Sequence, residues 1–184
     1  MSLHTDTATA FSVAVRQAHV QVTDERGQRS ILFALLATVV VVDQATKWWA
    51  WRNASGTSIN EGASPFVGTT VSTWYEGRVS GSLLDFLAVG VIGTAVSVLA
   101  RRRRPILVLI PGALMIGGWG SNLLDRLGMH HVTAPTSARG AVDFIPLGPV
   151  SWNVADLFIV VGTSLCLLVA AWAPRRMGKP APVR

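Results

Sequence analysis

The sequence predicts an all-α membrane protein with four transmembrane helices and an extracytoplasmic loop subdomain in which short β-strands can form. Half of its 184 residues are hydrophobic and only 14% are charged, whereas about a quarter of the residues of an ordinary soluble domain are charged. The mean hydropathy is +0.43, and the apolar residues gather in four long blocks. Together these observations argue against a soluble domain.

Each apolar block is long enough to cross a membrane, because a transmembrane helix needs about 20 predominantly apolar residues. The predicted spans cover residues 31–51, 83–100, 105–124 and 152–173. They form one domain, 31–173, between a polar tail, 1–30, and a basic tail, 174–184. The first tail lacks the apolar core and the cleavage site of a secretory signal peptide, so we expect the first span to stay in the protein.

Lys and Arg residues predict the orientation of the spans, since they concentrate in cytoplasmic segments. Eleven of the 16 lie in the two tails and in the all-arginine turn 101–104. An even number of spans places these three segments on one side, so we expect both termini in the cytoplasm and the loops 52–82 and 125–151 outside. Because the basic residues lie between apolar blocks, the net charge of +6 fits membrane topology, and we expect no nucleic-acid partner.

Cysteine and histidine give no sign of a metal or redox site. The single cysteine, Cys166, lies in an apolar run and cannot form a disulfide within the chain. His130 and His131 are adjacent, and neighbouring side chains without further ligands are poor chelators. We expect neither a metal nor a cofactor.

Glycines predict close contacts between the spans, because small residues let transmembrane helices approach one another. Gly117, Gly118 and Gly120 lie in the third span, and Gly90 and Gly93 lie in the second.

Several polar side chains lie inside or beside the spans. A charged side chain at the centre of a span costs about 2.5–3.5 kcal/mol on insertion scales, which makes it a candidate functional residue. Residues three or four apart share a helix face. Pairs with this spacing are Asp43 with Lys47, Asn122 with Arg126, and Asn153 with Asp156. By the predicted topology, all six lie in the outer half of the membrane or at its outer surface.

Simpler interpretations exist for some of the charged residues. Lys47 could reach the outer interface with its long side chain. Asp125 could form an ordinary interfacial ion pair with Arg126. Asp85, which opens the second span, is more typical of an interfacial residue than of a catalyst.

Asp143 and Asp156 differ from these residues, because each lies in an apolar stretch with no basic residue nearby in the sequence. Two carboxylates brought together in a dry site cannot both ionise, so they share one proton. One can then act as a base for water while the other acts as an acid toward a scissile carbonyl. This chemistry predicts an intramembrane aspartic peptidase, which needs neither a metal nor a nucleophilic side chain.

Three segments together resemble the lipoprotein signal peptidase family, also called signal peptidase II. They are residues 43–47 (DQATK), residues 117–126 (GGWGSNLLDR), and the pair 140–145 (GAVDFI) with 153–156 (NVAD). The order of the motifs, the four spans and the predicted orientation all fit, over about residues 31–173. The chain resembles a somewhat divergent member of this family.

The resemblance implies an aspartic endopeptidase of the bacterial cytoplasmic (inner) membrane. Such enzymes remove the signal peptide from prolipoproteins and cut just before a cysteine that carries diacylglycerol. Asp143 and Asp156 are then the catalytic pair. The residues expected to line or support the site are Asn122, Arg126, Asn153, Asp43 and Lys47. The expected partners are lipid-modified prolipoproteins and membrane lipids, and we expect a monomer.

The chain departs from the family before its second span, where the family has a motif of the type Asn-x-Gly-Ala. By distance from that span, the corresponding stretch is 74–79, with Tyr75 in the place of the asparagine and in a supporting role. A literal motif of this type, residues 60–63 (NEGA), lies only 13 residues beyond Lys47.

A second departure is the stretch 127–139, which is longer than the usual link between the second and third motifs. Both departures lie in loops expected to contact substrate. They leave open a divergent paralogue with a different membrane substrate, or a catalytically weak binding protein. A proton-coupled carrier is a further alternative, but its polar groups would be spread across the depth of the bilayer.

Overall fold

The computed structural model describes residues 25–62, 68–101, 104–148 and 150–176. Four long helices dominate it, and all four are long and apolar enough to cross a membrane. They are α2 (Glu25–Asn53), α4 (Arg78–Arg101), α5 (Ile106–Leu124) and α7 (Val154–Arg176). The predicted all-α membrane fold with four spans is confirmed.

The helix bounds differ from the predicted spans most clearly in α2, α4 and α5. Helix α2 begins at Glu25, inside the stretch predicted as a polar tail, and α4 begins at Arg78 instead of residue 83. The third span does not stop at residue 124, because α5 continues through a π-helical turn, η2 (Asp125–Met129), into α6 (His130–Thr133). Gly128 in this turn has φ 114°, a conformation that favours glycine.

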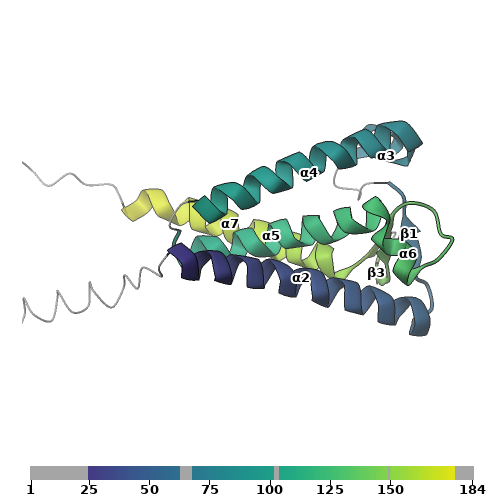
Figure 1. Ribbon diagram of the computed structural model, residues 1–184, viewed down its shortest axis with the longest axis horizontal. Coiled ribbons are helices and arrows are strands. Elements are labelled where there is room, and N and C mark those ends of the chain that lie inside the picture. The colour runs from purple at the N-terminus through teal and green to yellow at the C-terminus, as the bar shows by residue number, and fades with distance from the viewer. Residues whose placement is uncertain (1–24, 63–67, 102–103, 149, 177–184) are drawn as a thin grey trace, which may run out of the picture.

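Helices α2, α5 and α7 lie side by side, whereas α4 leans away from them toward the end of the molecule that carries the strands (Figure 1). At the other end, Leu99 of α4 packs against a small core of Leu32, Leu109 and Ala113. Both ends of the described chain, the start of α2 and the end of α7, lie at that same end (Figure 1).

Two of the glycines predicted to allow close helix approach do so. A Cβ at Gly117 would lie 2.9 Å from Val39 of α2, and a Cβ at Gly118 would lie 2.5 Å from the carbonyl oxygen of Ala155 in α7. The prediction is wrong for Gly120, Gly90 and Gly93, which face open space with no atom within 4 Å of an added Cβ. Helix α5 is therefore packed closely against α2 at Gly117 and against α7 at Gly118.

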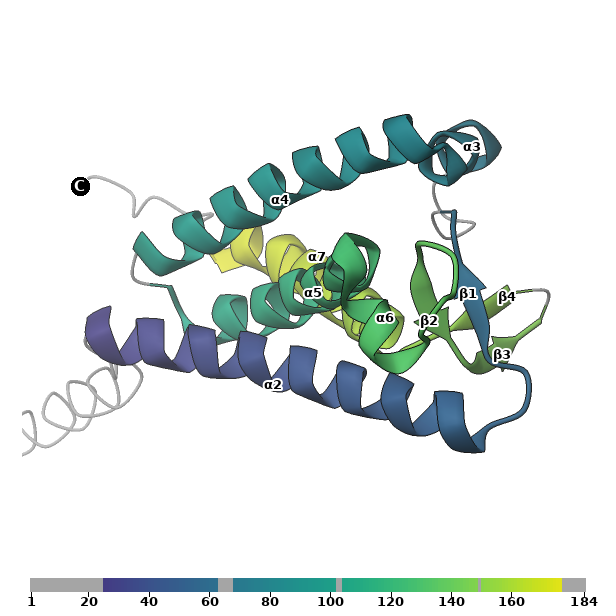
Figure 2. The same cartoon turned by 45° about the vertical axis from the view of Figure 1, so that its right-hand side comes forward.

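The loops between the spans form two small antiparallel sheets, as expected for the loop subdomain. In the first, β1 (Ser58–Asn60) pairs with β2 (Ala141–Asp143), and Ser58 lies opposite Asp143. In the second, β3 (Ile145–Leu147) pairs with β4 (Val150–Trp152). The short helix α3 (Gly68–Glu76) precedes α4. The sheets lie at the end of the bundle opposite the two chain ends (Figure 2).

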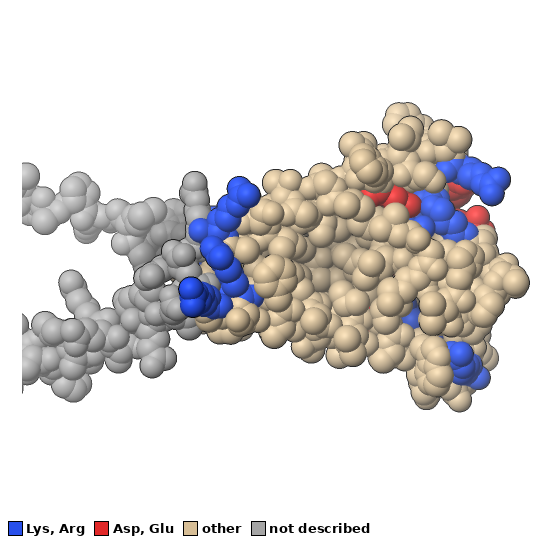
Figure 3. Space-filling view, in the orientation of Figure 1, with Lys and Arg blue, Asp and Glu red and all other residues tan. Residues whose placement is uncertain are grey.

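The surface matches this architecture. Lys and Arg side chains appear at the two ends of the molecule, with a broad belt of other residues between them (Figure 3). Large apolar side chains are exposed along the helices, for example Phe86, Leu107 and Leu167. Several charged side chains are buried, among them Asp43, Lys47, Asp85 and Asp125. Between its two ends the protein thus presents apolar side chains outward and keeps charged ones inside, as a hydrocarbon solvent requires.

Candidate active site

Asp143 is buried at the end of β2, with 1% of its surface exposed. Its Oδ2 accepts a hydrogen bond from the Asn60 side chain at 3.0 Å, and its Oδ1 accepts one from the Asn153 side chain at 2.6 Å. Burial raises the pKa of Asp143 to about 7, and the negative charge of Asp156 adds to the shift. This carboxyl group therefore holds a proton up to about neutral pH.

Asp156 lies in the first turn of α7. Its Oδ1 accepts a hydrogen bond from the Asn122 side chain, and its Oδ2 accepts one from the backbone N–H of Asn153, both at 3.0 Å. In return, the Asn153 Oδ1 accepts the backbone N–H of Asp156 at 3.0 Å. This reciprocal arrangement caps the helix, and the positive end of the helix dipole favours a negative carboxylate there.

Asn153 joins the two carboxylates. Its side-chain amide donates to Asp143 at 2.6 Å and to the Asn122 Oδ1 at 3.0 Å. The side chain is fully buried, so its orientation is fixed by these partners. The structure thus brings together four residues from different elements. Asp143 lies in β2, Asn122 in α5 and Asp156 in α7, and Asn153 directly precedes α7.

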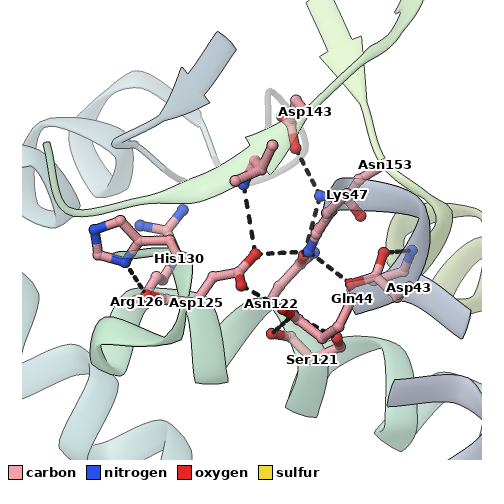
Figure 4. A network of polar contacts seen from close by, with 12 residues as sticks. Asp43, Gln44, Lys47, Ser121, Asn122, Asp125, Arg126, His130, Asp143 and Asn153 are labelled. Atoms are coloured by element: carbon pink, nitrogen blue, oxygen red, sulfur yellow. Dashed lines mark hydrogen bonds and ion pairs between the residues drawn. The ribbon is translucent and has the colours of Figure 1, made fainter. Parts of the chain in front are cut away.

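The Lys47 side chain lies next to this group and stabilises it (Figure 4). Its Nζ contacts Asp43 at 2.6 Å and Asp125 at 2.7 Å, and it donates to the Asn122 Oδ1 at 2.8 Å. An ammonium group has three donors, and all three are used. The side chain is fully buried, so the alternative in which Lys47 reaches out to the interface is wrong.

The two carboxylates beside Lys47, Asp43 and Asp125, accept hydrogen bonds from different helices. Asp43 accepts hydrogen bonds from the Ser121 hydroxyl and from the backbone N–H of Ala155, both at 2.7 Å. Asp125 accepts one from Gln44 at 2.9 Å. The suggestion that Asp125 pairs with Arg126 is wrong, because Asp125 pairs with Lys47.

Arg126 binds the backbone around β1. It donates to the carbonyl oxygens of Glu61 at 2.9 Å and Asn60 at 3.3 Å, and also to that of Gly62. Its guanidinium carbon lies 4.9 Å from the centre of the Tyr75 ring. Arg126 therefore holds the segment that brings the Asn60 side chain to Asp143.

The assignment of Tyr75 to the place of the family asparagine is wrong. Asn60, in the literal motif 60–63, is the residue that donates to Asp143. Tyr75 is nevertheless close to the site, since its ring stacks on Arg126. Asn60 takes this place because β1 pairs with β2, which puts Asn60 beside the strand of Asp143. Distance from the second span along the sequence gives no sign of this pairing.

His130 and His131 are neighbours in the short helix α6. His130 is buried and its Nδ1 contacts the backbone oxygen of Asp125, while its ring lies against that of His131. Among the residues that the structure describes, no three His, Cys, Asp or Glu side chains are grouped so that they could hold a metal ion.

Sequence reasoning missed Gln44, Ser121 and the structural role of Asp125. Gln44 and Ser121 are uncharged, and their partners come from another helix. Helical spacing could have drawn attention to them, because Gln44 follows Asp43 and Ser121 lies four residues before Asp125.

This fold and this site define a class: a four-span membrane protein whose polar interior brings two carboxylates, Asp143 and Asp156, into one hydrogen-bonded group. The pair lies at the end of the bundle that carries the sheets, next to apolar helix surfaces.

The comparisons with known proteins narrow this class. The family model described as signal peptidase (SPase) II matches residues 35–172. A lipoprotein signal peptidase of Caulobacter vibrioides is 34% identical over 155 residues, which cover 75% of this chain and 84% of that protein. The chain belongs to the signal peptidase II family. It is accordingly a membrane-bound aspartic endopeptidase.

Solved structures support the fold. A bacterial membrane enzyme determined at 2.3 Å resolution aligns with a TM-score of 0.60 and 16% identity, over 84% of this chain and 95% of that one. A second, determined at 1.9 Å resolution, aligns with a TM-score of 0.51 and 14% identity, over 77% and 92% of the two chains.

Proposed function

We propose that Asp143 and Asp156 are the catalytic pair with which this chain performs the reaction of its family, the removal of signal peptides from prolipoproteins. The observation that carries the assignment is the chain of hydrogen bonds in which the buried Asn153 side chain links Asp143 to Asn122, which in turn donates to Asp156. The alternatives of a weak binding protein or a different membrane substrate have no observation in their favour.

The two carboxyl groups have different surroundings, which suggests different roles. With a pKa of about 7, Asp143 holds the shared proton and acts as the acid toward the scissile carbonyl oxygen. Asp156 accepts two hydrogen bonds at a helix start, which favours its charged form, and it acts as the base for the attacking water.

Proton transfers then balance across the reaction. Asp156 takes a proton from water as the oxygen attacks the peptide carbon, and Asp143 gives its proton to the carbonyl oxygen. The resulting diol collapses when the C–N bond breaks. The proton held by Asp156 goes to the departing amine, and the new carboxyl group returns a proton to Asp143.

The supporting residues keep this geometry. Lys47, with Asp43 and Asp125, fixes Asn122 and the start of α7, and Arg126 fixes the Asn60 segment. The substrate proposed is a prolipoprotein whose cysteine carries diacylglycerol, because its acyl chains can lie in the bilayer while its peptide reaches a site at the sheet-bearing end.

We further propose that this end faces away from the cytoplasm and that both termini are cytoplasmic. In support, both ends of the described chain lie together, opposite the sheets (Figure 1), and the tails and the turn 101–104 hold most of the basic residues. The exposed apolar belt is expected to contact membrane lipids, and the proposed enzyme works as a monomer because one chain supplies both carboxylates.

The test is a gel-shift cleavage assay with the purified protein in detergent and a diacylglyceryl-modified prolipoprotein. Wild type should cleave it, and Asp143→Asn and Asp156→Asn should each lower the rate by at least about 10³-fold, as expected when a residue that exchanges a proton is removed. Glu76→Gln, which neutralises an exposed carboxylate on α3, is the matched control and should keep full activity. Substantial cleavage by either dyad variant would remove that residue from the catalytic pair.

A further inference from the structure

Arg139, which the proposed mechanism does not use, lies near the end of the long link from η2 through α6 to β2. Arg139 forms a forked contact with Asp85 of α4, in which its Nε and Nη2 lie 3.1 and 2.5 Å from the Asp85 Oδ2. Its remaining nitrogen, Nη1, donates to the backbone carbonyl of Tyr75 at 3.0 Å. One side chain thus ties the link to both helices of the α3–α4 corner, which we define as residues 75–85.

Burial makes this contact costly to break. The Asp85 side chain is only 2% exposed, whereas Arg139 is 25% exposed. Removing one member of a buried ion pair leaves the other charge uncompensated. The second Asp85 oxygen, Oδ1, has no hydrogen-bond partner, so the hydrogen bonds described for this carboxylate come from Arg139.

The corner is shaped around the guanidinium group. A Cβ at Gly81 would lie 2.3 Å from the Tyr75 carbonyl oxygen and 2.6 Å from the Arg139 Nη1. A side chain at this position would therefore displace the contact between Arg139 and Tyr75. Glycine leaves the space in which the fork fits.

The first turns of helix α4, near the sheets, make few other buried contacts. Its buried residues are Gly81 and Asp85, and both lie against Arg139. Around them, Leu83, Phe86 and Leu87 are 61%, 75% and 62% exposed. In this part of the described chain the helix also leans away from the other three (Figure 1).

The corner is connected to the carboxylate pair by two routes. Arg139 lies in the segment that leads into β2, the strand of Asp143. The Tyr75 ring stacks on Arg126, and Arg126 binds the carbonyl of Asn60, whose side chain donates to Asp143. A shift of the corner would therefore be transmitted to the Asn60 segment and to the start of β2, at the border of the site.

We propose that Asp85 and Arg139 are positioning residues: their ion pair, with the Tyr75 carbonyl, fixes the α3–α4 corner at the border of the active site and thereby sets the affinity for the lipid-modified peptide. This inference rests on the proposed function only for its kinetic consequence. The structural consequence, a fixed corner, can be measured without any substrate.

The kinetic experiment compares Asp85→Asn, Arg139→Gln and the double variant with wild type. Each single variant should raise KM about fivefold or more, the size of effect expected for a residue that couples to a site without touching it, with kcat within about twofold. The double variant should resemble the single variants, because both remove the same interaction. Arg139→Lys keeps the charge but cannot serve two acceptors through a fork, so it should restore only part of the affinity.

Arg78→Gln is the matched control. It removes an exposed arginine at the start of the same helix, and KM should stay at the wild-type value. A KM that changes as much in Arg78→Gln as in Arg139→Gln would overturn the proposal, since general loss of positive charge near the site would then explain the effect. Additive effects in the double variant would also overturn it.

Hydrogen–deuterium exchange on the full-length protein in detergent measures the corner directly. In Asp85→Asn and Arg139→Gln, amides of α3 and of the first turns of α4 should exchange at least about tenfold faster, while amides of α5 and α7 keep their wild-type rates. Unchanged exchange in α3 would overturn the proposal even if the enzyme is active. Faster exchange in a protein that shows no cleavage would uphold the corner contact and count against the proposed function instead.

Discussion

At the residue scale, the environment of Asp143 predicts how pH acts on the enzyme. Its pKa is raised to about 7 by burial and by Asp156, so the acid form that the proposed mechanism requires is lost as pH rises through this value. The pKa of this carboxyl group is about 4 in the unfolded chain. Between that pH and the folded value, the native state binds more protons than the unfolded chain. The free energy of unfolding therefore falls as pH rises through this window.

The first prediction compares Asp143→Asn with wild type by thermal unfolding in detergent between pH 4 and pH 8. Asparagine cannot ionise, so the variant should lose the penalty that wild type meets as pH rises. Its Tm relative to wild type should therefore increase toward pH 8. Parallel Tm curves for the two proteins would show that Asp143 is not titrating in this window.

Lys47 gives a second prediction at this scale. Lys47→Met leaves Asp43 and Asp125 buried without their shared cation, which should cost about 3–5 kcal/mol of stability. Thermal unfolding in detergent measures this loss. Arg52→Gln, at an exposed position one turn further along α2, is the control. A Lys47→Met protein as stable as wild type would mean that the fold does not depend on the ion pairs of Lys47 with the two carboxylates.

Residue-scale sequence reasoning succeeded where the signal was local. Asp143 and Asp156 stand out because each is an acid in an apolar stretch, and the structure places both in one hydrogen-bonded group. It failed for Asp125, which was matched with its neighbour Arg126. Adjacent residues on a helix point in different directions, so Asp125 reaches Lys47 while Arg126 reaches β1.

At the scale of elements, the four helices could be predicted because a membrane span requires a long apolar stretch with every backbone group paired within the helix. The position of Asn60 could not. It depends on which strand pairs with β2 and in what register, and such a pairing between distant segments leaves no periodic signal in three-residue strands. The continuation of α5 beyond residue 124 was missed because the apolar block ends there, at the charged residues Asp125 and Arg126.

Packing between α5 and α7 leads to a third prediction. Gly118→Ala would place a Cβ 2.5 Å from the Ala155 carbonyl oxygen and 2.8 Å from the Ile159 side chain. The helices must separate, which should cost about 1–3 kcal/mol and shift Asp156, so cleavage should fall at least about tenfold.

Gly120→Ala is a control of the same chemical size in the same helix. The added methyl group meets no atom within 4 Å, so stability and cleavage should match wild type or improve slightly, since alanine favours helix. Equal losses in the two variants would mean that glycine is needed in α5 for a reason other than contact with α7.

At the scale of the whole molecule, one arrangement unites the buried charges and the apolar exterior. The buried charged groups Asp43, Lys47, Asp125 and Asp143 lie in one connected set between α2 and the sheets, rather than through the full depth of the bundle. This distribution fits a peptidase that acts at one membrane face, and it disfavours the proton-coupled carrier, whose polar groups should line a path across the bilayer.

The orientation of the molecule is the last prediction. With Cys166 replaced by serine, a cysteine is introduced either by Arg26→Cys, near the start of α2, or by Leu147→Cys, in the β3–β4 hairpin, where both native side chains are exposed. If the sheets face away from the cytoplasm, a membrane-impermeant maleimide applied to intact spheroplasts should label the Leu147→Cys protein. The Arg26→Cys protein should be labelled only after the membrane is permeabilised, because an even number of spans keeps both chain ends on the inner side. Labelling of Arg26→Cys in intact cells would reverse the orientation and would place the carboxylate pair at the cytoplasmic face, where translocated prolipoproteins could not reach it.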